Sequence, residues 1–220
     1  MVAVIKAEVV HHGDWSELTK AHNVEVRNPH FAVSPKDDIN IEYLVIRAER
    51  KEEIKNFIND IKFHSKVIKL LNYDIYKNTG YIIFIGKYSD SIKGIFMENM
   101  AIFKSAKFLD GVEFFTFLMP FYNKDIVDKI KEKLNNISTL LKFDIIKLQD
   151  NIIDLSLLTK KEREIVLKAY RWGYFDYPRS AGLDELSKYF GISKTTLNYH
   201  IHNAIKKLIK YYLLEEEKIN

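Results

Sequence analysis

The chain has 220 residues, of which 47% are hydrophobic and 29% charged, a balance typical of folded globular proteins and unlike that of disordered chains. It contains no cysteine, which excludes disulfides, thiol chemistry and cysteine-based zinc sites. The first residues lack a signal-peptide pattern, and no apolar run approaches the roughly 18 residues of a membrane helix. We therefore expect a soluble cytoplasmic protein of two domains that does not associate with membranes.

The net charge of +4 is unevenly distributed. Residues 159–220 contain 12 Lys and Arg against 8 Asp and Glu, whereas the residues before them contain 22 of each. The segment from Lys194 to Tyr212 contains four lysines and no acidic residue. A locally basic helix is typical of phosphate binding, although a solvated helix face can have the same composition.

In chain order, the first 150 residues alternate between strand and helix patterns. Runs of β-branched and alternating residues predict strands, and apolar residues recurring every three or four positions predict helices. Strands are expected at 2–10, 24–26, 41–48, 67–76, 81–88, 101–108, 112–119 and 139–148, and helices at 51–63, 91–99 and 123–136. Turn sequences at 77–80 and 109–111 predict two hairpins. Residues 11–15 and 28–38 are expected to be loops.

This order predicts an α+β fold. Residues 1–150 are expected to form an antiparallel-sheet sandwich of ferredoxin-like β-α-β repeats. The segment from Asp150 to Asp154 is interpreted as the joint between domains. The pattern then becomes entirely helical, so residues 155–220 are expected to form an all-α helix-turn-helix domain.

Three helices are expected in this second domain. Thr159 and Glu162 form a capping box that begins the first helix, and Gly173 ends it. Its apolar face is expected to consist of Ile165, Val166, Ala169 and Trp172. The second helix spans 183–190 and ends at Gly191. Ser193 is the expected N-cap of the third helix, which runs through Tyr212.

The second and third helices have the spacing of a helix-turn-helix. Such a pair needs apolar residues at the crossing, a small residue where the helices approach, and a turn residue that tolerates a left-handed backbone. Ser187 is the small residue and Gly191 the turn residue. The apolar residues at the crossing are Leu186, Phe190, Ile192, Leu197 and Ile201.

Residues on the outer face of the third helix are predicted to contact DNA, because a recognition helix lies in the major groove. Lys194 suits guanine or phosphate, Asn198 suits adenine, and Tyr199 suits a phosphate. The predicted DNA-binding residues are Lys194, Thr195, Thr196, Asn198, Tyr199, His202, Arg179 and Lys206. The alternative is a small helical bundle that docks against protein.

The string from Leu158 to Val166, the string from Gly173 to Arg179 and the helix-turn-helix closely resemble the C-terminal domain of archaeal bacterio-opsin-activator-like regulators. Gly-Tyr-Phe-Asp-x-Pro-Arg is the specific part of this resemblance, which implies a transcription regulator that binds double-stranded DNA. The N-terminal part also resembles the partner domain of that family, but Asp14 stands where many members carry a cysteine. Within the Gly173 string, Tyr174, Phe175 and Tyr177 are expected to fill the core of the helical domain.

Neither a metal site nor a cofactor is expected. His11, His12, His22 and His30 share a loop-rich segment with Asp14, but none shows the helical pair spacing of a strong zinc signal. The sequence contains no phosphate loop, nucleophile elbow or obvious carboxylate pair, so an enzyme is not expected.

Two roles for the first domain remain open. An α+β sandwich can hold a small-molecule effector, or it can serve dimerisation or contact with the transcription machinery without a ligand. A homodimer is expected, because paired heads can read two half-sites. The alternative function is a protein-interaction adaptor whose helical domain contacts the transcription machinery without binding DNA.

Overall fold

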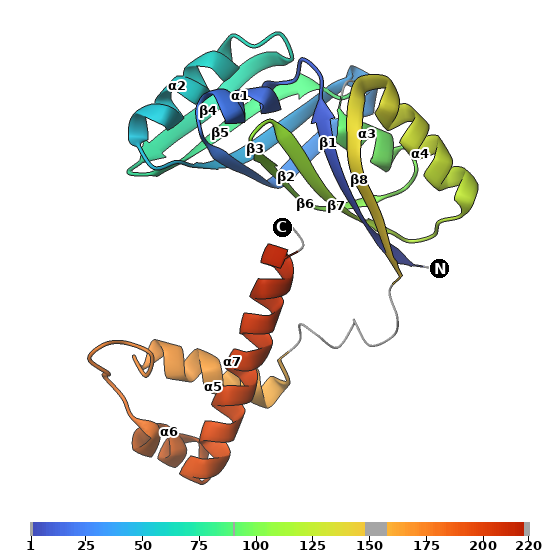
Figure 1. Ribbon diagram of the computed structural model, residues 1–220. Coiled ribbons are helices and arrows are strands. Elements are labelled where there is room, and N and C mark those ends of the chain that lie inside the picture. The colour runs from blue at the N-terminus through green and yellow to red at the C-terminus, as the bar shows by residue number, and fades with distance from the viewer. Residues whose placement is uncertain (1, 90, 148–157, 218–220) are drawn as a thin grey trace. The chain divides into compact units, whose positions relative to one another are not determined.

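The computed structural model describes residues 2–89, 91–147 and 158–217. The chain divides into two compact units, one ending at residue 148 and the other beginning at residue 149 (Figure 1). The predicted joint from Asp150 to Asp154 lies outside the described residues.

The N-terminal unit contains one antiparallel sheet of eight strands in the order β4-β5-β3-β2-β6-β7-β1-β8. The strands are β1 Ala3–His11, β2 Glu25–Ser34, β3 Ile39–Arg47, β4 Val67–Tyr76, β5 Thr79–Lys87, β6 Ile102–Leu109, β7 Val112–Met119 and β8 Ser138–Lys147. The predicted antiparallel sheet is confirmed, as are both hairpins. In the second hairpin, Asp110 and Gly111 adopt positive φ values of 53° and 78°, as a tight turn requires.

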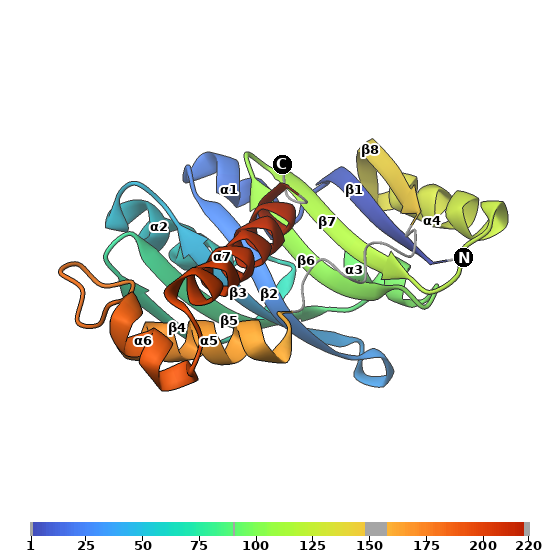
Figure 2. The same cartoon turned by 90° about the horizontal axis from the view of Figure 1, so that it is seen from below.

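The helices of this unit lie on one face of the sheet (Figure 1), and the view from below looks onto the opposite face (Figure 2). The helices are α1 Leu18–Ala21, α2 Lys51–Lys62, α3 Ile92–Met97 and α4 Lys124–Ile137, with 3-10 turns at Trp15–Glu17 and Pro35–Asp37. Every second residue of β1 is buried and those between are half-buried, because successive side chains of a strand point to opposite faces. No helix among the described residues is long and apolar enough to span a bilayer.

The prediction of a loop at 28–38 is wrong over most of its length, because β2 continues to Ser34. The pairing of β2 with β3 shifts register between Arg27 and His30. Pro29 lies in this bulge, where a residue without an N–H group breaks no ladder bond. The Asn28 side chain donates to the carbonyls of His30 and Tyr43 at 2.9 and 2.8 Å, replacing backbone bonds that the bulge removes.

The two halves of the sheet meet between β2 and β6, a junction we call the seam. Only Val26, Arg27 and Asn28 pair with Phe108, Lys107 and Ala106 at this junction. Every other pair of neighbouring strands in the described sheet is joined over seven or more positions. The Trp15 ring lies 5.8 Å from Phe84 of β5 and 4.6 Å from Phe108 of β6, so it packs across the seam.

The C-terminal unit contains the three predicted helices, α5 Lys160–Arg171, α6 Leu183–Phe190 and α7 Lys194–Glu217. The capping box of α5 is confirmed: the Glu162 N–H donates to Thr159 Oγ1 at 3.2 Å, and the Thr159 N–H donates to Glu162 Oε2 at 2.8 Å. The small core consists of Ile165, Ala169, Tyr174, Leu186, Leu197 and Ile201.

The prediction that three aromatic residues fill this core is right only for Tyr174. Phe175 is 42% exposed and Tyr177 is fully exposed. The Tyr174 N–H donates to the Ala169 carbonyl five residues earlier, which closes the C-terminal end of α5. The following loop closes on itself, because the Ser180 N–H donates to the Gly173 carbonyl. This closure turns the loop away from the core, so the last two aromatic rings face solvent.

Candidate functional site

Helices α6 and α7 are joined by a tight turn at residues 191–193. Gly191 has a φ of 61°, in the region that favours glycine. The Ile192 N–H donates to the Ser187 carbonyl at 3.2 Å, and Ser193 Oγ accepts from the Thr196 N–H at 3.1 Å. The predicted N-cap at Ser193 is therefore confirmed, and α7 begins at a fixed angle to α6.

One face of α7 is buried and the opposite face is open. Leu197, Ile201 and Ala204 are buried, at intervals of four and three residues. Four exposed residues with intervals of four, three and four lie opposite this stripe, given 3.6 residues per turn. These four residues are Thr195, Tyr199, His202 and Lys206. All of them belong to the set predicted to contact DNA.

Lys194, Thr196 and Asn198 lie on the flanks of this open face. Lys194 and Thr196 are exposed, and Asn198 is half-buried. Lys194 forms an ion pair with Asp184 of α6, and both side chains are 61% exposed. This pairing is not apparent from the sequence, because no periodic spacing within one helix connects the two residues.

Two further basic residues have partners within the C-terminal unit. The exposed Arg179 places its guanidinium 4.7 Å from the centre of the Tyr174 ring, which anchors it to the core. Lys207, which contributes to the predicted basic segment, donates to both carboxylate oxygens of Glu162 at 3.1 and 2.8 Å. Lys207 therefore joins α7 to α5, and Lys206 remains on the open face.

Residues 158–210 match the protein family described as HTH DNA binding domain. These residues form an HTH DNA-binding domain. The resemblance to bacterio-opsin-activator-type regulators is thereby confirmed for this segment.

Relatives of the HTH DNA-binding domain occur in Haloferax volcanii. The dimethyl sulfoxide reductase transcriptional activator of that organism is 43% identical over 56 residues, which are 26% of this chain and 26% of the relative. Its transcriptional regulator NarO is 33% identical over 57 residues, which are 26% of this chain and 27% of the relative. The similarity spans about a quarter of each relative's length, and both relatives are named as transcription regulators.

The histidines of the N-terminal unit do not gather into one site. His12 contacts the Thr139 hydroxyl at 2.9 Å, and His22 contacts Asp60 at 2.7 Å. His30 stacks on Tyr43 with ring centres 6.3 Å apart. These three histidines have separate partners, and His11 is the one of the four predicted histidines that lies beside Asp14 in the described part of the chain.

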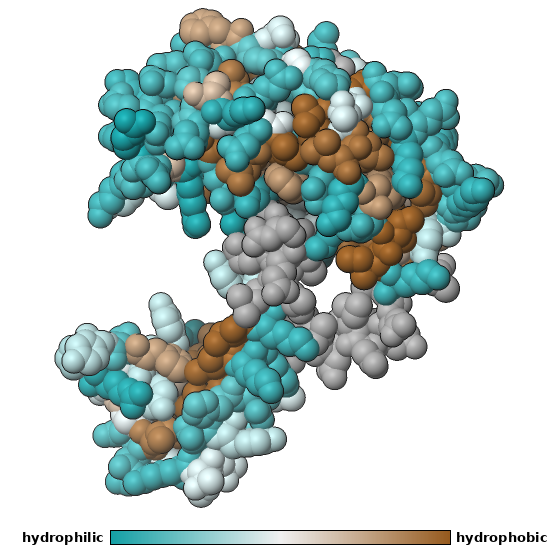
Figure 3. All heavy atoms as spheres, viewed as in Figure 1, coloured by the Kyte–Doolittle hydropathy of each residue, from teal (hydrophilic) through white to brown (hydrophobic). Residues whose placement is uncertain are grey.

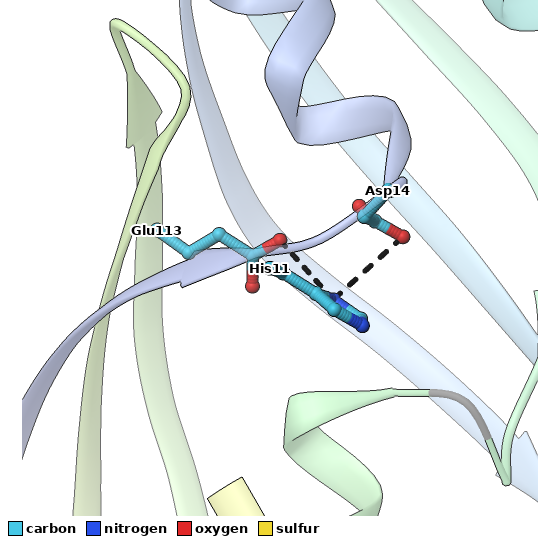
Figure 4. Close-up of side chains that lie close together, drawn as sticks. All are labelled: His11, Asp14 and Glu113. Atoms are coloured by element: carbon cyan, nitrogen blue, oxygen red, sulfur yellow. Dashed lines mark ion pairs between the residues drawn. The ribbon is translucent and has the colours of Figure 1, made fainter. Parts of the chain in front are cut away.

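His11, Asp14 and Glu113 form a buried cluster (Figure 4). His11 Nδ1 lies 3.8 Å from Asp14 Oδ2 and 3.5 Å from Glu113 Oε1. His11 ends β1 on the helix-facing side, and the register of β1 with β7 pairs Val9 with Glu113. A turn through Gly13, with φ of 66°, brings Asp14 back to the same side. Glu113 was missed in the sequence because it comes from a strand far along the chain.

Burial and neighbouring charges together shift the pKa values of Asp14 and His11. Burial and the charge of Glu113 raise the pKa of Asp14 to about 7, because the charged form loses hydration and meets a second carboxylate. For His11, burial opposes the charged form, but the hydrogen bond with Glu113 and the nearby carboxylates outweigh it and raise the pKa above 6.5. The two carboxylates give the cluster an excess of negative charge, which favours the binding of protons or other cations.

The cluster borders a cavity of about 40 Å³ between the sheet and the helices. Asn40, Glu42 and Lys93 also line it. Lys93 Nζ donates to both Glu42 oxygens at 2.5 and 2.6 Å, so these two buried charges satisfy one another. Asn40 Oδ1 is buried with no hydrogen-bond partner in the described part of the chain.

Proposed function

We propose that this chain is a sequence-specific transcription regulator that binds double-stranded DNA through α7. The observation that carries the proposal is the open face of Thr195, Tyr199, His202 and Lys206, which lies opposite the buried stripe of the recognition helix. Hydroxyl, imidazole and ammonium groups on one helix face suit base edges and phosphates. Lys194, Thr196 and Asn198 extend this surface, and Arg179 supplies a further phosphate contact.

The experiment begins with duplexes recovered from fragmented genomic DNA by the full chain. Affinity for a recovered duplex is then measured by fluorescence anisotropy over a range of salt concentrations. Lys206→Ala should weaken binding to all duplexes alike and reduce the slope of log affinity against log salt by about 1. Asn198→Ala should lower affinity for the recovered site by roughly tenfold, with a smaller effect on random duplex.

Lys62→Ala, which removes an exposed lysine of the N-terminal unit, serves as the matched control. It should leave both affinity and salt slope unchanged. If Lys206→Ala and Asn198→Ala bind as the wild type does, α7 does not read DNA. Failure of the full chain to recover any duplex would instead favour the adaptor that contacts the transcription machinery.

We further propose that residues 1–150 are a sensor or dimerisation domain and residues 155–220 the DNA-binding domain of a cytoplasmic homodimer. Leu208, Ile209 and Tyr212 of α7 are 43%, 52% and 61% exposed, and Figure 3 shows apolar side chains gathered along this helix. Their spacing of one, three and four residues suits packing against a second helix. A second copy of α7 would cover this stripe and place two helix-turn-helix domains side by side.

The finer architecture of the N-terminal unit supports a ferredoxin-like assignment, which we retain as a proposal. The elements β1, α1, β6, β7, α4 and β8 follow the β-α-β-β-α-β order. Their strands are neighbours in the sheet as β6-β7-β1-β8. The remaining elements, from β2 to α3, are inserted between α1 and β6. An effector bound to the N-terminal unit would act on the sheet that joins both halves.

A further inference from the structure

We propose that His11, Asp14 and Glu113 bind a divalent first-row transition-metal ion inside the N-terminal unit. This inference goes beyond the proposed function, because the ion can bind whether or not the chain reads DNA. It also names a cation of defined chemistry as the occupant of the cavity between sheet and helices.

The geometry of the three side chains fits such an ion. Metal bonds of about 2.1 Å to nitrogen and oxygen place neighbouring ligand atoms of a tetrahedral site about 3.4 Å apart. His11 Nδ1 is 3.5 Å from Glu113 Oε1 and 3.8 Å from Asp14 Oδ2. The three ligand atoms all lie within 4.8 Å of one another, and Figure 4 shows both carboxylates directed toward the ring. Small movements of the side chains would complete the site.

The surroundings favour a cation over an anion or an organic molecule. Two buried carboxylates repel an anion. Three lysines also line the cavity: Lys93 is already bound by both oxygens of Glu42, Lys66 is half-buried and Lys87 is exposed. A cavity of about 40 Å³ has room for an ion and one or two waters but not for a metabolite. One imidazole and two carboxylates are a donor set that suits zinc, iron, cobalt or manganese.

Two neighbouring groups support the site independently. Asn40, which is 5% exposed and lines the same cavity, has an amide oxygen without a hydrogen-bond partner among the described residues. Such an oxygen can accept from a metal-bound water or bind the ion itself. Asp14 Oδ1 accepts from the Ser16 N–H at 3.1 Å, which holds the carboxylate so that Oδ2 faces His11.

The test uses the full chain, stripped of metal with a chelator and then desalted. Addition of Co²⁺ should produce visible d–d absorption that saturates at one ion per chain, and Zn²⁺ should displace it. Asp14→Asn and Glu113→Gln keep the side-chain shapes but remove a charged ligand, so each should weaken Co²⁺ binding by about 100-fold or more. Asp60→Asn, which disrupts the His22–Asp60 pair at the surface, is the matched control and should bind as the wild type does.

Wild-type protein alone provides a second measurement that does not depend on whether the variants fold. Saturating Zn²⁺ should raise its thermal unfolding temperature, because a ligand that binds only the folded state stabilises that state. The proposal is overturned if the wild type shows neither Co²⁺ absorption nor a Zn²⁺-dependent rise in unfolding temperature. It is equally overturned if folded Asp14→Asn and Glu113→Gln retain wild-type affinity. A histidine paired only with two carboxylates would then account for the cluster.

Discussion

At the scale of single residues, Lys194 has one partner in the free chain, Asp184, and a second under the proposed function, a DNA phosphate. In the free chain its ammonium is paired with Asp184, so under the proposed function a DNA phosphate would compete with a carboxylate for the same group. An exposed ion pair contributes only a small amount of free energy, which makes the exchange easy. The lysine is thereby held at the start of α7, near the position that phosphate would take.

We predict that Asp184→Asn strengthens DNA binding by roughly two- to fivefold, because it frees Lys194 and removes a negative charge beside the duplex. Anisotropy titrations at two salt concentrations would measure the change, which should shrink at the higher salt. Glu164→Gln removes the same charge from the exposed surface of α5 and should have a smaller effect. Equal affinities of both variants and the wild type would contradict a role for the pair.

The positions of the candidate residues on α7 were predictable because they follow from helical periodicity after the Ser193 cap, whereas Arg179 lies in the loop between α5 and α6. Thr195, Tyr199 and His202 lie on the open face for the same reason that Leu197 and Ile201 are buried. The partners of these side chains were not predictable. Asp184, and likewise Glu113 in the N-terminal cluster, are brought into place by packing between separate elements, which leaves no local pattern.

At the scale of elements, the capping box of α5 is also a contact between helices. Glu162 caps the helix and accepts from Lys207 of α7. The hydrogen bond from Lys207 is the main cause of a lowered Glu162 pKa, with the bonds from Thr159 adding to it against the opposing effect of burial. A lowered pKa in the folded state means that the ionised carboxylate stabilises the fold.

The stability contributed by Glu162 should therefore be fully present at neutral pH and be lost as the pH falls below 4.5, its ordinary pKa, toward its lowered value. Hydrogen exchange of α5 and α7, corrected for the intrinsic pH dependence, would show falling protection over this range. Glu162→Gln should lower protection at neutral pH and flatten this dependence. Glu164→Gln, on the same helix, should leave the dependence intact. An unchanged pH profile in Glu162→Gln would refute the assignment.

Most helices and strands were predicted to within a few residues, because alternation and three-to-four periodicity report directly which face is buried. Strand β2 was the main failure. Asn28, Pro29 and Ser34 are typical of turns, yet the strand contains a bulge that accommodates the proline and uses the asparagine side chain as a backbone substitute. Long-range pairing overrode the local preference of these residues.

At the scale of the whole molecule, the two units have separate hydrophobic cores. Leu186→Ala should destabilise the C-terminal unit by about 2–5 kcal/mol, since it leaves a cavity in a core of few residues. Hydrogen exchange of the full chain should then accelerate in residues 158–217 and not in residues 2–147. Phe84→Ala, in the other core, should give the reverse pattern. Acceleration in both units by either change would show that they unfold as one.

The seam is the part of the N-terminal sheet with the fewest backbone pairs between neighbouring strands. Three residue pairs between β2 and β6 resist bending far less than the longer ladders on either side. Trp15 helps to hold the two halves together there, since its ring contacts aromatic side chains from both halves. The torsional stiffness of the eight-stranded layer at this line therefore depends on side chains, namely Trp15, the Phe31–Phe103 ring pair and the Lys107–Glu25 ion pair.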